Sequence, residues 1–224
     1  MQRFIAPAPA PIDVVLDVQA GHVEVIAADR ADAVVEVRPA DAARKRDAEL
    51  SERTTVDLTD DVLRITAVAP VSNRILGASG AVEVTVRIPA GSRIEAASSA
   101  IEFRGTGRLG EVVLDGALGT VRIEEAGGAR LTIHSGDVLV GRLTGDAEIS
   151  TGKGDLTITE VTRGTVELRT QSGDITIGAA RGVSAVLDAG TGYGRVHNTL
   201  ENSGTPELTV RATTSYGDIT AHAV

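Results

Sequence analysis

The chain has 224 residues, enough to bury a substantial core, and only 2% of them are aromatic, so Val, Ile, Leu and Ala must build its interior. Its formal net charge of -9 at pH 7 argues against a nucleic-acid partner, because a phosphate backbone demands clusters of Lys and Arg. The chain contains no cysteine, which excludes disulfides, thiolate zinc sites and cysteine nucleophiles.

The amino-terminal stretch MQRFIAPAPAPIDVV has no apolar run of signal-peptide length and carries prolines where such a run would lie. No part of the sequence approaches the roughly 18 consecutive apolar residues of a membrane-spanning helix. We therefore expect a soluble protein without a membrane span, located in the cytoplasm.

Residues 1–92 alternate between apolar and polar positions, but less regularly than the rest of the chain. The segment AGHVEVIAAD at 20–29 reads as a strand, and AVVEVRP at 33–39 is expected to be its partner. The segments 54–67 and 81–96 continue the alternation, whereas PADAARKRDAELSER at 39–53 breaks it and is expected to form a loop or a short surface helix. We expect this third to supply the first coils and a cap, because an open solenoid end exposes unpaired strand edges.

A glycine-centred phrase recurs through residues 93–224, for example as TGKGDLTITE at 151–160 and TQSGDITIGA at 170–179. Apolar residues at alternate positions follow each glycine, as Leu156 and Ile158 do, and a second alternating pair such as Val166 and Leu168 comes later in each repeat. A lone apolar residue also recurs between the two strands, at Ala126, Leu143, Val161 and Ala179. The aligned positions are Ala100, Gly119, Gly136, Gly154, Gly173, Gly194 and Gly217.

A short unit of this kind cannot bury its apolar face alone, but parallel stacking buries that face and pairs the backbone groups between layers. We therefore predict an all-β fold: a β-solenoid of stacked coils of about 19 residues, with two short strands per coil and a less regular N-terminal cap. No linker-like stretch interrupts the sequence, so a single domain is expected over 1–224, with irregular coils and cap at 1–92 and regular repeats at 93–224.

The Gly-Asp-[Val/Ile/Leu] repeats, the segment VTVRIPAGSRIEA at 84–96 and the ending ATTSYGDITA at 212–221 resemble the DUF4097 β-strand-repeat family, whose members are often labelled putative adhesins. The likeness spans nearly the whole chain. The resemblance implies a β-solenoid fold and a role in surface attachment, and it implies no catalytic residues.

The sequence contains residues that could suggest a cofactor or metal site, but their sequence context does not support one. GTGRLG at 105–110 matches a dinucleotide-binding pattern, but a strand-like alternation follows it where a helix is required. The histidines His22, His134, His197 and His222 form no helical i, i+4 pair. No cofactor or metal site is expected.

The residue after each glycine should form a row along the stack: Thr120, Asp137, Asp155, Asp174, Arg195 and Asp218. Adjacent aspartates could bind a cation or a hydroxyl-rich ligand, but aspartate beside glycine also hydrogen-bonds the local backbone and favours turns. Arg195 is expected where it can offset two of the acids.

Tyr193 and Tyr216 both precede the glycine in adjacent repeats and should stack, forming either a stabilising ladder or a platform for a sugar ring or a partner protein. Glu148 and Glu167 should face outward on neighbouring coils, with Arg169 diagonal to Glu148. A carboxylate pair of this kind can serve glycoside hydrolysis or ordinary surface charge pairing.

These observations predict a non-catalytic, adhesin-like scaffold or interaction module for an unknown protein or carbohydrate partner, not an enzyme. The alternative is a carbohydrate-binding or polysaccharide-acting protein that uses the outward carboxylates and the tyrosine ladder. A further possibility is that the chain associates with copies of itself through the solenoid ends or edges, where strand edges are unpaired. The candidate interaction surface comprises Tyr193, Tyr216, Asp155, Asp174, Arg195 and Asp218.

Overall fold

The computed structural model describes residues 2–67 and 80–224 and shows an all-β, solenoid-like fold with 70% strand and 4% helix. The chain divides into two compact units, unit 1 at residues 1–119 and unit 2 at residues 120–224. In unit 1 the elements are β1 (Gln2–Pro7), β2 (Asp13–Val18), β3 (Ala20–Ala28), β4 (Asp32–Pro39), α1 (Lys45–Arg53), β5 (Thr55–Thr59), β6 (Val62–Ala67), β7 (Val82–Pro89) and β8 (Arg93–Leu118).

Unit 2 consists of strands that pair in parallel. They are β9 (Val121–Ser135), β10 (Val138–Leu143), β11 (Ala147–Lys153), β12 (Leu156–Val161), β13 (Gly164–Ser172), β14 (Ile175–Ala179), β15 (Ala185–Tyr193), β16 (Val196–Thr199), β17 (Leu208–Tyr216) and β18 (Ile219–Ala223).

The strands of unit 2 form two rows that share the long strand β9. One row runs β9, β11, β13, β17, β15, and the other runs β9, β10, β12, β14, β18, β16. Successive repeats lie in register, so that Leu156 on β12 is opposite Val138 on one side and Ile175 on the other. The strands inside each row are therefore paired on both edges. The end strands β15 and β16 each have a partner on one side among the described strands, which leaves the sheet open.

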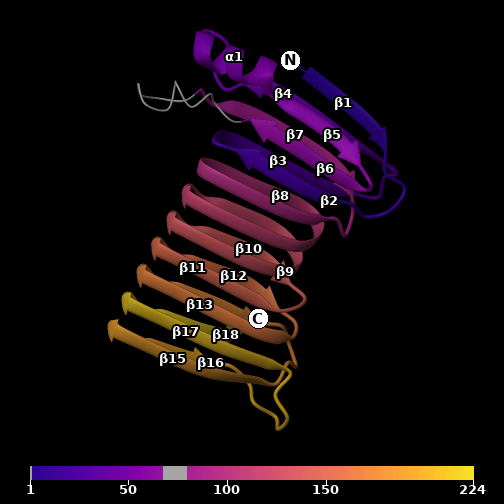
Figure 1. Ribbon diagram of the computed structural model, residues 1–224. Helices are drawn as coiled ribbons and strands as arrows, with labels where there is room; N and C mark the ends of the chain where they lie inside the picture. The colour runs from indigo at the N-terminus through magenta and orange to yellow at the C-terminus, as the bar shows by residue number, and fades with distance from the viewer. Residues whose placement is uncertain (1, 68–79) are drawn as a thin grey trace. The chain divides into compact units, whose positions relative to one another are not determined.

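The last two repeats do not stack in chain order. The last two strands of the chain are inserted: β17 lies between β13 and β15, and β18 lies between β14 and β16, as the yellow and orange strands of Figure 1 show. The expected ladder followed the order of the sequence and is wrong at this point. The physical reason is the apolar character of the inward residues: β18 offers Ile219, which is completely buried in the interior of the stack, whereas β16 offers Val196 and the polar Asn198. The more apolar strands, β17 and β18, therefore lie inside the two rows, and β15 and β16 lie at the ends of the rows.

Unit 1 contains a similar insertion. Strand β2 pairs in parallel with both β6 and β8, and β3 pairs with both β7 and β8, although β2 and β3 precede all of these strands in the chain. The expected pairing of 33–39 with 20–29 is therefore wrong. Both edges of β3 are taken by parallel partners, so β4 pairs antiparallel with β7 and β1 instead.

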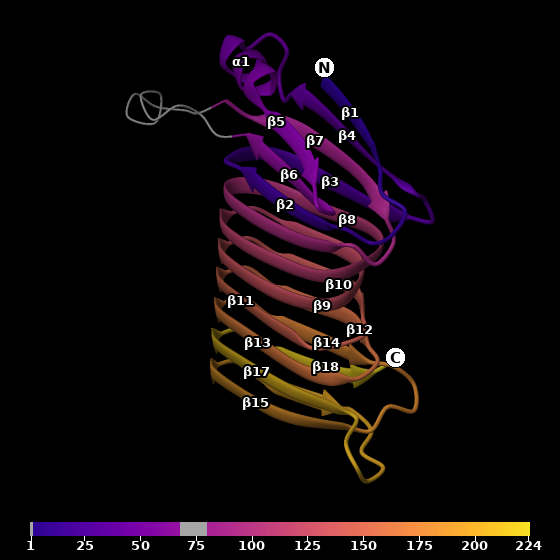
Figure 2. The same cartoon turned by 45° about the vertical axis from the view of Figure 1, so that its right-hand side comes forward.

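The antiparallel strands β1, β4 and β5 and the helix α1 make the first third of the chain less regular, as Figure 2 shows. The short helix that was one of the two expectations for 39–53 is confirmed at Lys45–Arg53. It is fixed by Leu50, which is buried, and by the buried carboxylate of Asp47, which accepts hydrogen bonds from the backbone N–H groups of Asp41 (3.1 Å) and Ala81 (3.0 Å).

The inward positions predicted from the repeat form the core. Leu156, Ile158, Val166 and Leu168 are each at most 1% exposed, and the lone apolar residues between the strands are also buried. Inward threonines complete each layer at the strand ends: the Thr170 hydroxyl donates to the Gly154 carbonyl oxygen (3.2 Å), and the Thr214 hydroxyl donates to that of Gly173 (3.1 Å). These polar groups satisfy the backbone where the chain turns.

Candidate binding surface

The repeated glycine is required by the turn between the two rows of strands. Gly173 has a φ of 154°, and a Cβ built on it would lie 2.0 Å from the carbonyl oxygen of Gly154 in the neighbouring repeat. Gly217 meets the Gly173 carbonyl oxygen in the same way, at 2.0 Å. The glycine thus allows two repeats to approach at the turn, which no larger residue would permit.

The residue after the glycine joins one repeat to the next. The backbone N–H of Asp174 donates to Asp155 Oδ1 (2.8 Å), that of Asp218 donates to Asp174 Oδ1 (2.8 Å), and that of Arg195 donates to Asp218 Oδ1 (2.8 Å). Asp155 in turn donates its own N–H to Asp137 Oδ1 (2.9 Å). One carboxylate oxygen of each aspartate is therefore engaged in the stacking of repeats.

Arg195 stands at the end of this aspartate row, next to Asp218 and beyond it. The expectation that it offsets two aspartates is wrong, because the inserted strands place Asp218 directly after Asp174. An arginine can end the row because no further repeat follows whose backbone N–H would need a carboxylate acceptor at this position. Within residues 2–67 and 80–224, no group of three or more His, Asp and Glu side chains is arranged to hold a metal ion.

The predicted stacking of Tyr193 and Tyr216 is confirmed. The two ring centroids are 5.0 Å apart, the planes are inclined by 3°, and the side chains are 71% and 58% exposed. The pair ends a row of strand-terminal residues, which runs Ser135, Lys153, Ser172, Tyr216, Tyr193.

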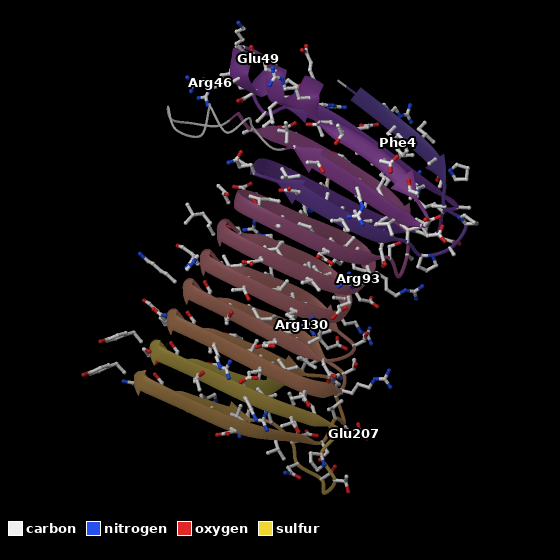
Figure 3. The ribbon with its side chains drawn as sticks, in the orientation of Figure 1. Phe4, Arg46, Glu49, Arg93, Arg130 and Glu207 are labelled. Carbon is white, nitrogen blue, oxygen red and sulfur yellow. The ribbon has the colours of Figure 1, made fainter. Side chains whose placement is uncertain are left out.

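Glu148 and Glu167 lie directly opposite each other on β11 and β13. They belong to a row of outward charges in which basic residues flank the acids: Arg130 is opposite Glu148, and Arg211 is opposite Glu167. Arg169 forms its ion pair with Glu167 on the same strand. Figure 3 shows Arg130 among the polar side chains on the outer surface of these strands. The arrangement is an alternation of charges along a sheet.

A hollow of about 440 Å³ lies beside this charge row, on the same face of β9, β11, β13 and β17. The sequence interpretation did not find it, because the hollow depends on which outward positions of four separate repeats lie side by side. The available signal was the run of small residues at these positions. The residues that line it include Thr132, Ser150, Arg169, Gln171, Thr213 and Ser215.

The parallel rows of glycine-turn repeats define a class of protein: an all-β repeat protein with a solenoid-like fold. The chain belongs to the Toastrack DUF4097 family, whose sequence profile matches residues 13–223. No curated protein matches the sequence.

Solved structures with a similar arrangement share little sequence with the chain. A "putative adhesin" from Bacteroides fragilis has 10% identity and a TM-score of 0.45, and one from Parabacteroides distasonis has 14% identity and a TM-score of 0.45. A "putative lipid binding protein" from Parabacteroides distasonis has 11% identity and a TM-score of 0.48. Each match covers 98% of this chain and 96% of the other. Among the described residues, no helix has the length and apolar character needed to cross a membrane.

Proposed function

We propose that the chain is a non-catalytic interaction module, adhesin-like in that it presents a rigid surface to a partner. In this proposal, coils of about 19 residues with two short strands each serve as the scaffold for that surface. One observation supports this proposal above all: the carboxylates of Asp155, Asp174 and Asp218 each accept a hydrogen bond from a backbone N–H group of a neighbouring repeat. The stack thus commits its recurring acids to assembly, and it leaves the stacked tyrosines exposed for contact.

The rival function is polysaccharide cleavage by Glu148 and Glu167, which are adjacent on one face. A glycosidase needs one carboxyl group as acid and another as base or nucleophile, on either side of the scissile bond. Here the basic neighbours Arg130, Arg169 and Arg211 surround the two acids as charge partners on an outer strand surface. This setting supports surface pairing.

Turnover assays decide between the two functions. The purified chain is incubated with polysaccharides, p-nitrophenyl esters and nucleotides, beside a Glu148→Gln/Glu167→Gln double variant. We expect no turnover above the rate of the buffer with either protein. Robust turnover by the unmodified chain that disappears in the double variant would overturn the proposal.

A capture experiment tests the interaction itself. The immobilised chain is expected to retain a reproducible partner from native extract, and a Tyr193→Ala/Tyr216→Ala variant is expected to retain less. Leu139→Ala, which changes an exposed residue of β10 in the other row of strands, is the matched control.

A further inference from the structure

The hollow on unit 2 crosses four adjacent strands at right angles to their direction. Its lining comes from outward positions of β9, β11, β13 and β17, which pair in that order. Three strand spacings correspond to about 14 Å, so the hollow is an extended depression and not a pocket for one small ion. An elongated ligand fits this form.

The lining is rich in free hydroxyl groups. In the described part of the chain, the side chains of Thr132, Ser150, Thr213 and Ser215 are not used in any hydrogen bond, in contrast to the inward Thr170 and Thr214. The amide of Gln171 adds a donor and an acceptor at the same surface. The hollow therefore offers many neutral donors and acceptors along its length.

The hollow is open towards the end of the row of strands. Gly190 on β15 lies opposite Thr213, and a Cβ built on it would meet nothing within 4 Å. A second glycine, Gly192, follows two positions later and is also exposed. A ligand that lies in the hollow can thus continue over β15 without meeting a side chain.

The tyrosine pair lies at the strand ends immediately after the residues that line the hollow. Tyr216 directly follows Ser215, and one face of its ring is covered by Tyr193. On the other side, the neighbour in the row is Ser172, whose side chain is too short to cover a ring, and the next is Lys153. The aromatic face towards Ser172 is therefore available for stacking, with a Lys153 ammonium as a hydrogen-bond donor beyond it.

An exposed aromatic face beside a strip of hydroxyl and amide groups matches the chemistry of a sugar chain, which has an apolar C–H face and an edge of hydroxyls. Charge selects among sugars. The lining of the hollow contains no carboxylate among the described residues, and its guanidinium, Arg169, is paired with Glu167. His134 also lines the hollow. The lining therefore offers hydrogen-bonding groups without an unpaired guanidinium for an anionic sugar, and the net charge of -9 on the chain disfavours anionic glycans further.

We propose that this hollow, together with the Tyr193–Tyr216 pair at the adjoining strand ends, binds a neutral oligosaccharide chain. The site rests on the proposed function as an interaction module and names the class of its partner. The sugar stacks on Tyr216, and its hydroxyl groups exchange hydrogen bonds with Gln171, Ser215 and their neighbours on the adjoining strands.

The chain itself supplies a spectroscopic probe. Its two tyrosines both belong to the stacked pair, and it has no tryptophan, so intrinsic emission reports on this place alone. The full chain is titrated with cellotetraose, maltotetraose, mannotetraose and xylotetraose, with tetragalacturonate as the anionic comparison. We expect a saturable change of tyrosine emission with at least one neutral probe, and none with tetragalacturonate.

Variants then locate the binding by calorimetry with the probe that responds. Tyr216→Ala should weaken binding about tenfold, whereas Tyr216→Phe, which keeps the ring, should bind as the unmodified chain does. Gln171→Ala should weaken binding several-fold. Leu139→Ala, in the other row of strands, is the control and should leave the affinity unchanged. Circular dichroism establishes that each variant is folded.

Two results would overturn the site: no response to any of the four neutral probes, or a response that Tyr216→Ala leaves intact. If no sugar binds while the chain captures a protein through the tyrosines, the sugar site fails and the interaction module stands. If a probe binds here and is cleaved, the non-catalytic function fails and the site stands.

Discussion

At the scale of single residues, the repeated Gly-Asp phrase performs two linked tasks. The glycine lets the carbonyl oxygen of one repeat approach the next, and the aspartate supplies an acceptor for the N–H of the following repeat. Neither task is visible within one repeat, since both partners lie in the neighbouring one. This explains why the pair recurs together.

Removing one carboxylate from the row should loosen the contact between two repeats. Asp155→Ala leaves the backbone N–H of Asp174 without its acceptor, and we expect a loss of about 1 kcal/mol in the free energy of unfolding. Asp155→Asn keeps an oxygen at the same place and should cost clearly less. Urea unfolding followed by circular dichroism measures both. Equal losses in the two variants would mean that the hydrogen bond is not what the aspartate contributes.

At the scale of strands, the order of stacking depends on differences between nearly identical repeats. The sequence carries the same phrase in each of them, so any repeat offers the next one a compatible edge. What decides is how apolar the inward positions are: β18 presents Ile219 and Ala221, whereas β16 presents Val196 and Asn198. Asn198 is polar, and Arg195 ends the aspartate row. Both residues suit the last repeat of the stack, which faces solvent on one side.

A matched pair of truncations tests this order. Ile219 and Val196 occupy the same position of the repeat and lie opposite each other, but Ile219 is completely buried and Val196 is 46% exposed. Ile219→Ala should therefore cost about 2–5 kcal/mol, and Val196→Ala less than about 1 kcal/mol. Urea denaturation gives both values. A larger loss for Val196→Ala would indicate stacking in chain order.

The same comparison shows what could be predicted from the sequence. Alternation identified the inward residues, because the spacing of a strand assigns each residue to a face whatever its partner is. The stacking of Tyr193 and Tyr216 was predictable, because their repeats are neighbours in either order. The short connection between β3 and β4 suggested a pairing that the parallel partners of β3 exclude. The hollow could not be predicted, because it requires the order of strands that the repeats leave open.

At the scale of the whole molecule, stability should be close to a sum of terms from the repeats and from the contacts between neighbours. Each layer of the core is thin and contains no tyrosine, and the two phenylalanines of the chain, Phe4 and Phe103, lie in unit 1. A layer in unit 2 is therefore filled by aliphatic side chains and closed at the turn by a threonine. One charge inside such a layer has no group to pair with.

Placing a carboxylate on either face of the strands tests this picture. Val166 on β13 is completely buried between Ala147 and Val210, so Val166→Asp puts an unpaired charge in a dry layer and should cost several kcal/mol, comparable to the total stability of many domains. Thr132 on β9 faces outward opposite Ser150, and Thr132→Asp should cost well under about 1 kcal/mol. Thermal melts followed by circular dichroism compare the two variants. If Thr132→Asp unfolds the chain while Val166→Asp does not, the assignment of inward and outward faces is inverted throughout the stack.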